Sequence, residues 1–491
     1  MSEELPPGWA EITLSDLGLP ATPKIDPQRS ATETFELYSV PSFDTEAPEL
    51  ALGKSIASTR QAVEPGDVLL CKINPRINRV WIVAPRSRHR QIASTEWVVV
   101  RPHGHEPRFF MWQMRAEEFR ERLLDDVSGV GGSLMRARTV GIEKLRLRVP
   151  PVAEQRRIVA RIEALFARIR QARADLLRIT SLSERYRLTV LRAALRGELT
   201  ADWRSRVGAL EPAERLVART PAPSQPRGGR EATDEVIPGV AALSVNHPRT
   251  EPPPGWTWVP LLRLARQESG HTPSRSVAAY WNGDIPWIGI RDAGAHHGGV
   301  IQDTAQHVTQ AGLDNSSARL LPAQTVCLSR TASVGYVVVM GRPMATSQDF
   351  VTWTCSSALL PDFLKYALLA EGDDIRRFGK GSTHTTIYFP EIRALHICLP
   401  PLAEQHEIVR LLDQALTAVG NATHDADRAY ILLDHLERSI LTRAFRGDLV
   451  PQDPADEPAA VTLPCAEIRS APRGRQRGAR AATYREIMAD G

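Results

Sequence analysis

Two loops in the first half of the chain concentrate side chains that can distinguish DNA bases. In the major groove, arginine or lysine pairs best with guanine, and asparagine or glutamine pairs best with adenine. A loop at 72–79, between two apolar runs, and a glycine-rich loop that ends near 138 both contain such residues. The candidates in these loops are Lys72, Asn74, Arg76, Asn78, Arg79, Ser133, Arg136 and Arg138.

The second half of the chain has loops of similar chemistry at matching places. The candidates there are Arg330, Thr331, Ser333, Lys380, Ser382, Thr383 and His384. We expect the four loops to contact nucleic acid. Two alternatives stay open, because contacts with phosphates position a protein without specifying sequence, and polar loops are often only solvated.

Motifs that carry catalysis are missing from the sequence. There is no glycine-rich cofactor loop after a first strand, and no hydrolase nucleophile or metalloprotease motif. Gly379–Thr383 has the wrong glycine spacing for a phosphate-binding loop. The five cysteines are scattered and no histidine pair completes a zinc site, so we expect no bound metal. The pattern predicts a chain that binds rather than catalyses.

Length and composition are those of a folded, multidomain, soluble protein. The chain has 491 residues, of which 42% are hydrophobic and 24% charged, which suggests two to four domains. The net charge is +4, and only six of the 61 basic residues are lysine, so arginine dominates. No apolar run of 18 or more residues and no signal peptide occur, so we expect a cytoplasmic location.

The chain contains an internal duplication with an offset of about 250 positions. Three landmarks recur in the same order: Glu4–Trp9 as Glu251–Trp256, Pro150–Gln155 as Pro400–Gln405, and Leu195–Leu199 as Phe445–Leu449. Each copy therefore has a variable front part of about 140 residues and a helical rear part of about 50.

The rear parts carry a heptad pattern that predicts two long helices. Apolar residues follow one another in alternating steps of four and three, the spacing of a coiled-coil seam. The residues expected to pair the helices are Ile158, Ile162, Leu165, Ile169, Leu176, Ile408, Leu412, Val419, Leu433 and Leu436. Each helix needs a partner for its stripe, and the other copy supplies one. We expect the two helices to pack in an antiparallel coiled coil.

The front parts predict mixed globules, because short apolar runs typical of strands alternate with short helical segments. The expected fold class is α+β, with two tandem α/β domains that are each followed by a long helix. The boundaries are a first domain at 1–150, a helix at 151–203, a linker at 204–250, a second domain at 251–400, a helix at 401–450, and a disordered basic tail at 451–491.

The arrangement resembles the specificity (S) subunit of type I restriction–modification enzymes over roughly residues 4–450. The most specific marks are the repeated Pro-Pro-x-Ala-Glu-Gln at the start of a long helix and the repeated Arg-Gly-Glu/Asp-Leu at its end. Further marks are the two Pro-Pro-Gly-Trp openings, Asp284–Ile288, Ser347–Phe350 and the matching Ser94–Trp97. The first copy departs from the pattern, because it has Tyr38–Phe43 in place of an Ile-Pro-Trp-Ile segment.

This resemblance implies two target recognition domains held apart by paired helices, each reading one half of a split, asymmetric DNA target. Double-stranded DNA, methyltransferase (M) subunits and motor–nuclease (R) subunits would be the partners. S-adenosylmethionine, ATP and Mg²⁺ would be used by those partners, and this chain would bind no cofactor. The alternative is a non-catalytic scaffold whose duplicated globules bind other proteins, although a scaffold would not need basic loops at equivalent places in both halves.

Overall fold

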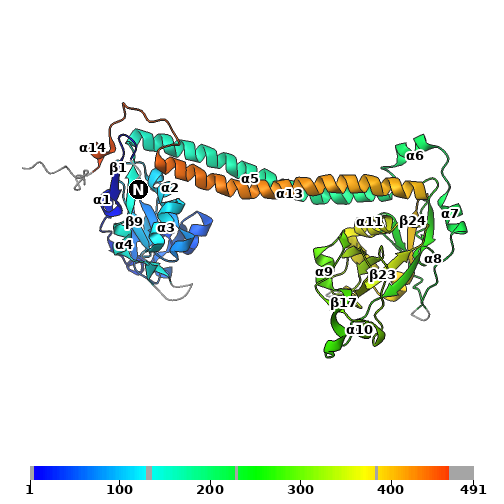
Figure 1. Ribbon diagram of the computed structural model, residues 1–491. Coiled ribbons are helices and arrows are strands. Elements are labelled where there is room, and N and C mark those ends of the chain that lie inside the picture. Colours follow the sequence, from blue (N-terminus) through cyan, green and yellow to red (C-terminus); the bar gives the residue numbers. More distant parts are fainter. Residues whose placement is uncertain (1–4, 126, 129–134, 227–230, 382–384, 464–491) are drawn as a thin grey trace, which may run out of the picture. The chain divides into compact units, whose positions relative to one another are not determined.

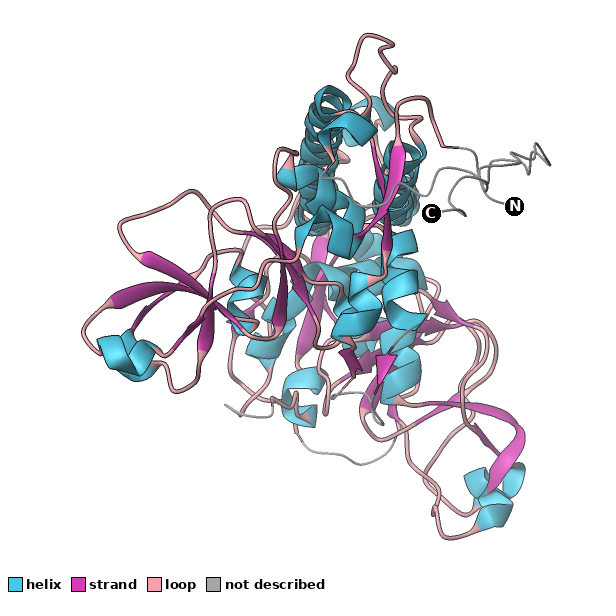
Figure 2. Cartoon of the chain, turned by 90° about the vertical axis from the view of Figure 1, so that its left-hand side faces the viewer, coloured by secondary structure: helices cyan, strands magenta, loops and turns pink. Residues whose placement is uncertain are grey.

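The computed structural model describes residues 5–125, 127–128, 135–226, 231–381 and 385–463. The chain forms two compact units. The first comprises Met1–Asp175 with Ala429–Gly491, and the second comprises Leu176–Arg428. Short helices and strands are interleaved in the globular part of each unit (Figure 1, Figure 2). The predicted α+β class, with two domains and two long helices, is confirmed.

The first unit contains a domain built on a five-stranded and a three-stranded sheet, with strand orders β2-β5-β8-β3-β4 and β7-β6-β9. Its strands are β1 Ala10–Thr13, β2 Lys24–Ile25, β3 Thr34–Tyr38, β4 Glu49–Leu52, β5 Arg60–Ala62, β6 Val68–Cys71, β7 Val80–Ile82, β8 Arg90–Ser94, β9 Trp97–Val100, β10 Val127–Ser128, β11 Arg136–Ala137 and β12 Arg146–Val149. Its helices are α1 Leu14–Gly18, α2 Pro107–Arg115, α3 Glu117–Asp125 and α4 Thr139–Glu143, with 3-10 turns η1 Pro27–Ser30, η2 Pro41–Thr45, η3 Gly53–Ser55 and η4 Pro75–Ile77.

The second unit contains a domain with a five-stranded, a four-stranded and a three-stranded sheet, with orders β16-β23-β20-β21-β18, β13-β14-β24-β15 and β19-β17-β22. Its strands are β13 Ile237–Pro238, β14 Leu243–Val245, β15 Thr257–Pro260, β16 Ala265–Ser269, β17 Trp281–Ile288, β18 Val300–Ile301, β19 His307–Val308, β20 Val326–Ser329, β21 Val337–Met340, β22 Ala345–Thr346, β23 Phe350–Cys355 and β24 Leu395–Leu399. Its helices are α6 Ala201–Val207, α7 Ala213–Arg219, α8 Leu261–Leu264, α9 Ile290–Ala295, α10 Gln310–Asp314, α11 Pro361–Glu371 and α12 Phe389–Arg393, with η5 Ala278–Tyr280 and η6 Gly372–Phe378.

The duplication seen in the sequence is repeated in the strand pairing of the two domains. In the first, β6 pairs antiparallel with both β7 and β9. In the second, β20 pairs antiparallel with both β21 and β23. The residues of β6 and β9 are all buried, which is why both strands are apolar at nearly every position instead of alternating.

The motifs at the start of each copy and at the start of each long helix meet in a buried polar cluster. Strand β1 pairs with β12, and β15 pairs with β24, which brings each opening tryptophan to the helix that follows. Trp9 Nε1 donates to Glu154 Oε2 at 3.1 Å, and Trp256 Nε1 donates to Glu404 Oε2 at 3.0 Å. Both carboxylates are almost fully buried. The repeated Pro-Pro-Gly-Trp and Pro-Pro-x-Ala-Glu-Gln motifs are therefore partners.

The glutamine of the same motif satisfies backbone groups that would otherwise be buried without partners. Gln155 Oε1 accepts from the backbone N–H of Glu106 at 3.0 Å, and its Nε2 donates to the carbonyl of Pro150. Gln405 Oε1 accepts from the N–H of Leu360 at 2.9 Å in the same way. Each glutamine thus ties the start of the long helix to the start of a domain helix, α2 or α11.

The two long helices are α5, Val152–Leu195, and α13, Leu402–Arg446, and segments of them pair antiparallel within each unit (Figure 1). In the first unit Arg173 of α5 forms ion pairs with Asp434 and Glu437 of α13. In the second unit Leu191 and Leu195 share a core with Ile408 and Leu412. The predicted antiparallel pairing is present in each unit.

Most of the predicted pairing residues are buried or partly buried. Five are buried and four are partly buried: Ile158, Ile162, Ile169, Ile408 and Leu412, then Leu165, Leu176, Val419 and Leu433. Leu436 differs, because 47% of its side chain is exposed. Leu436 borders an apolar groove of about 450 Å³ that is also lined by Ala172. The methyl side chain of Ala172 is too short to cover Leu436.

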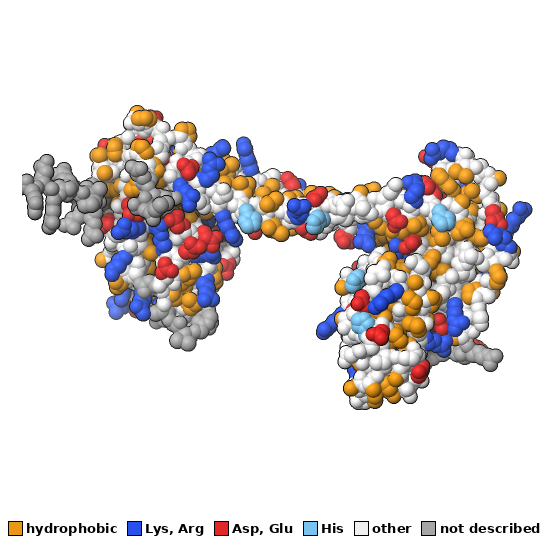
Figure 3. Space-filling model, viewed as in Figure 1, with side chains coloured by type: hydrophobic (Ala, Val, Ile, Leu, Met, Phe, Trp, Pro, Cys, Tyr) orange, Lys and Arg blue, Asp and Glu red, His pale blue; other side chains and the backbone are white. Residues whose placement is uncertain are grey.

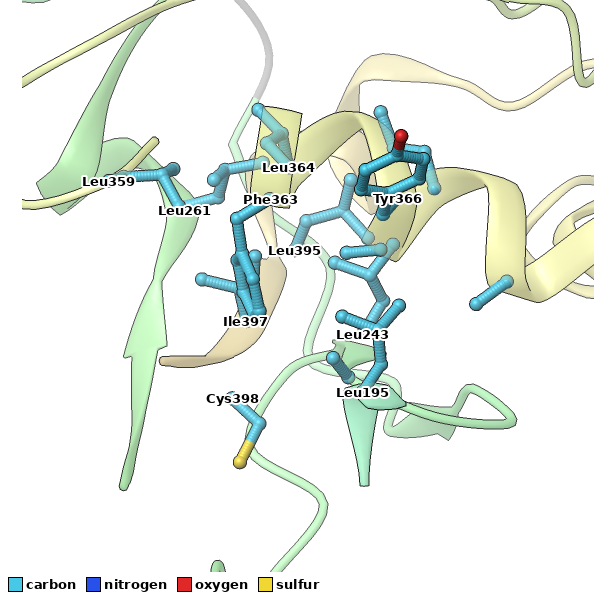
Figure 4. Close-up of a cluster of buried hydrophobic side chains, with 14 of the residues drawn as sticks. Leu195, Leu243, Leu261, Leu359, Phe363, Leu364, Tyr366, Leu395, Ile397 and Cys398 are labelled. Carbon is cyan, nitrogen blue, oxygen red and sulfur yellow. The ribbon is translucent and has the colours of Figure 1, made fainter. Parts of the chain in front are cut away.

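The segment predicted as a linker is part of the second domain. It contains α7, β13 and β14, and β14 pairs with β24 in the four-stranded sheet. Leu243 lies in the domain core with Leu195 and Leu395 (Figure 4). The N–H of Val240 donates to the Glu371 carboxylate at 3.0 Å, and burial raises the pKa of Glu371 to about 7. The expectation was wrong because strands this short carry too few residues to show a periodicity.

The tail predicted to be disordered from residue 451 is also ordered in its first part. Helix α14, Ala459–Thr462, packs on the first domain with Ala459 fully buried, and Asp456 forms an ion pair with Arg157 at 2.6 Å. The basic run at 473–477 lies outside the described residues. None of the helices in the described part of the chain is long and apolar enough to cross a membrane.

Each long helix is followed within two residues by a glycine with a left-handed backbone. Gly197 has φ +75°, and the N–H of Glu198 donates to the carbonyl of Ala193 at 2.9 Å, as in a Schellman motif. A Cβ at Gly197 would lie 3.2 Å from Trp256. Gly447 repeats this geometry with φ +86° and a close approach to Pro6. The Arg-Gly-Glu/Asp-Leu motif thus terminates the long helix and also packs against a Pro-Pro-Gly-Trp motif.

We predict opposite effects from two glycine substitutions in the second unit. Gly197→Ala should destabilise the unit by about 1–2 kcal/mol, because alanine resists a positive φ and its Cβ crowds Trp256. Gly420→Ala should stabilise it by about 1 kcal/mol, because Gly420 lies on an exposed helix surface with no atom near the added methyl. Urea unfolding followed by circular dichroism measures both, and effects of the same sign would contradict the prediction.

We also predict that the two Trp–Glu hydrogen bonds respond differently to pH. Burial raises the pKa of Glu154, and its Oε1 has no hydrogen-bond partner among the described residues. Glu404 also accepts from Thr200 at 2.6 Å and Arg204 at 2.8 Å. Trp9→Phe and Trp256→Phe should each cost about 1–3 kcal/mol of local stability.

The pH dependence follows from the raised carboxyl pKa. A group whose pKa is higher in the folded state stabilises the fold at acid pH, and this contribution is lost as the pH rises through the folded-state pKa. Trp9→Phe removes the donor that lowers the Glu154 pKa, so its cost should be larger at about pH 8 than at about pH 5. Hydrogen exchange of residues 150–160 and 400–410, corrected for intrinsic rates, tests this. Equal pH dependence in the two variants would contradict the prediction.

Candidate nucleic-acid interface

In the first domain the described end of the glycine-rich loop, residues 135–138, lies beside the 72–79 loop at the end of β6. The backbone N–H of Lys72 donates to the carbonyl of Glu96 at 2.9 Å, and the carbonyl of Lys72 accepts from the N–H of Ala137 at 3.0 Å. The N–H of Asn74 donates to the carbonyl of Met135 at 2.9 Å. Residues 72–74 are therefore joined both to the strand start at 96–97 and to the chain that leaves the glycine loop.

The second domain builds the same arrangement at the end of β20. The N–H of Arg330 donates to the carbonyl of Asp349 at 2.8 Å, and the carbonyl of Arg330 accepts from the N–H of Ile387 at 2.9 Å. Lys380 and Thr386 pair across the base of the second glycine loop through their backbones. Arg330 thus occupies the place that Lys72 has in the first domain.

An acidic residue supports each loop pair, and we had not included it among the candidate site residues. Arg136 donates to Glu96 Oε1 at 2.6 Å. Asp349 accepts from Thr331 Oγ1 at 2.7 Å and from Ser347 Oγ at 3.0 Å. The sequence signal was present, because Ser94–Trp97 and Ser347–Phe350 each place an acid two residues after a serine and next to a buried strand.

Four further candidate readers are also held by contacts within the protein. Asn78 Nδ2 donates to the carbonyl of Met114 at 2.9 Å. The Arg79 side chain is largely buried, with its Nε 4.0 Å from Asp44. The Arg330 guanidinium stacks on the Phe389 ring at 4.5 Å, and burial lowers its pKa. Lys380 pairs with Glu391 at 3.1 Å, which raises the lysine pKa. Their contacts favour a role in positioning the loops.

The remaining candidates differ in exposure. Arg76, Arg136 and Arg138 are exposed, whereas Lys72, Asn74, Thr331 and Ser333 are partly buried. Ser133, Ser382, Thr383 and His384 lie outside the described residues. Arg76 therefore combines exposure with a side chain suited to guanine or phosphate.

A polar cleft of about 640 Å³ lies beside the second loop, between residues 332–336 and the second half of α5. Its charged lining residues are Arg187 and Arg376 together with Glu184 and Asp373. Because both signs are equally represented, the cleft favours neither an anionic nor a cationic ligand. No group of three or more side chains suited to hold a metal ion occurs in the part of the chain that the structure describes.

Charges of both signs are also mixed on the domain surfaces. Figure 3 shows basic and acidic side chains interspersed on the visible face of each domain. A broad basic field would bind nucleic acid without regard to sequence. The face shown in Figure 3 carries no such basic field, so the loops are a more specific candidate for DNA contact than the surface charge.

Comparisons with known proteins agree with this architecture. Residues 253–424 match the family described as type I restriction modification DNA specificity domain. The MjaIX specificity subunit of Methanocaldococcus jannaschii is 25% identical over 162 residues, which cover 33% of this chain and only 38% of that subunit. The EcoDI specificity subunit of Escherichia coli is 21% identical over 372 residues, covering 74% of this chain and 75% of the relative.

Two solved structures share the fold. The HsdS subunit from Thermoanaerobacter tengcongensis aligns with a TM-score of 0.61 and 22% identity, over 91% of this chain and 99% of that one. A chain from a study of complex assembly in the type I R-M system aligns with a TM-score of 0.65 and 24% identity, over 91% of this chain and 100% of that one. The chain is thus similar to type I restriction–modification specificity subunits over most of its length, and its residues 253–424 match the specificity-domain family.

Proposed function

We propose that this chain selects the DNA site at which a type I restriction–modification complex acts. Each domain reads one short half of a split target, and the long helices set the unread spacer between the halves. The observation that carries the proposal is that both domains present a loop pair on the same strand ends, with different residues at the tips. Unlike loops on a shared framework favour two different half-sites and hence an asymmetric target.

We propose that the other activities of the complex reside in partner subunits. Methyltransferase subunits would dock on the long helices, and motor–nuclease subunits would join them for restriction. Exposed apolar side chains on the helices support docking: Leu177 and Leu182 in the second unit, and Ile431 and Leu432 in the first. Hydrophobic side chains are visible along both helices in Figure 3.

The proposal assigns no reaction to this chain. S-adenosylmethionine would be used by the methyltransferase subunits, and ATP with Mg²⁺ by the motor–nuclease subunits. In support of this division, Glu154, Glu404 and Asp349 are engaged in hydrogen bonds that hold the helix starts and a loop.

Methylome sequencing tests the specificity role directly. With the methyltransferase partner expressed, cells that carry the gene should show a split, asymmetric methylated motif, and cells that lack it should not. The control is a strain in which only the methyltransferase gene is deleted, where the same motif should vanish. A motif that persists without this chain, although the partner is present, would favour the protein-binding scaffold instead.

Removing the acid under the second loop should alter only one half of the target. Asp349→Ala releases Thr331 and loosens the loop, so we predict about tenfold weaker discrimination in one half-site and no change in the other. Asp373→Ala is the matched control, because that side chain is 99% exposed in the same domain. Binding of the assembled methyltransferase to a panel of single-base variants measures both. Equal effects on the two half-sites would contradict the assignment of one domain to each.

A further inference from the structure

The tip of the first reading loop is a rigid turn. The 3-10 turn η4, Pro75–Ile77, is bounded by Asn74 and Asn78, which both have left-handed backbones with φ of 48° and 50°. The N–H of Ile77 donates to the carbonyl of Asn74, and that of Asn78 donates to the carbonyl of Pro75, both at 3.0 Å. Such conformations persist only where the surrounding structure holds them, and they concentrate at functional sites.

Contacts from outside the loop hold this turn in place. The Asn78 side chain donates to the carbonyl of Met114 at the end of α2. Pro75 is buried, and the N–H of Asn74 is bonded to Met135. The turn is therefore anchored to a helix on one side and to the second loop on the other.

The two residues at the tip are exposed, in contrast to these anchors. Arg76 is exposed, and 55% of the Ile77 side chain is exposed although it is large and apolar. A single exposed isoleucine needs no explanation on an ordinary surface. Here it lies beside an exposed arginine on an immobilised turn, within the loop pair that we propose to read DNA.

We propose that Ile77 is a specificity-determining residue that contacts the 5-methyl group of a thymine in the major groove, with Arg76 on the neighbouring base pair. This inference rests on the proposed function and adds the base chemistry of one domain. The thymine methyl is the apolar group on a base edge in that groove, and apolar side chains distinguish it from the bare C5 of cytosine. Because the turn is formed before binding, little conformational entropy is lost when it meets DNA.

The test uses the assembled methyltransferase and oligonucleotides carrying the methylated motif. Each thymine in the motif is replaced in turn by deoxyuridine, which removes only the methyl group. One position in the half-site not affected by Asp349→Ala should weaken wild-type binding about fourfold, the value of one buried methyl group. Ile77→Ala should weaken binding to the thymine target by a similar factor and should not respond to deoxyuridine there.

A control variant separates a specific role of Ile77 from a general effect of removing an exposed apolar side chain. Leu50→Ala removes another exposed apolar side chain from the same domain and should behave as the wild type. Because Ile77 is mostly exposed, Ile77→Ala should keep the fold, which hydrogen exchange in α2 and α3 checks. A half-site without thymine, or losses from Ile77→Ala and deoxyuridine that add independently, would overturn the inference. Failure of the wild-type complex to prefer any motif would instead overturn the proposed function.

Discussion

The buried Trp–Glu hydrogen bond at the start of each long helix is the contact on which the rest of the structure depends. It joins the first strand pair of a domain to the helix that leaves the domain, so the direction of the helix is fixed relative to its own sheet. The neighbouring Gln155 and Gln405 extend the cluster to α2 and α11. A charge buried this deeply is tolerated only when its oxygens are bonded, which explains why tryptophan, glutamate and glutamine recur together in both copies.

The two clusters differ in how completely they neutralise that charge. Glu404 is paired with Arg204, which lies in α6 just after the end of α5. Among the described residues no arginine forms an ion pair with Glu154, and Arg157 beside it pairs with Asp456 of the ordered tail. The segments that follow the two helices therefore differ in function: α6 supplies an ion-pair partner to Glu404, whereas the tail pairs with Arg157 beside Glu154. Removing a partner from a buried ion is costly, so the second cluster depends on α6 as much as on its own domain.

The sequence predicted the duplication, the long helices and the position of the loops, because each depends on a regular pattern or a repeated motif. Ile158, Ile162, Ile408 and Leu412, which heptad spacing selects, are buried. The ordered segments around Leu243 and Ala459 were missed, because their strands and helix are too short to show a period. Residue type identified the loops but could not show that Asn78 and Arg330 are held by other residues. That information depends on Met114 and Phe389, which are distant in the sequence.

The loops are joined to their framework mainly through the backbones of Lys72 and Arg330. In each domain one N–H donates to the carbonyl of an acidic residue, and one carbonyl accepts from the chain that returns from the glycine loop. Hydrogen bonds of this kind do not depend on which side chain the residue carries. Successive substitutions at these tips can therefore accumulate without unfolding the domain. Under the function proposed above, a lineage that inherits this framework could acquire new DNA targets by point mutation, one half-site at a time, while its partner subunits stay the same.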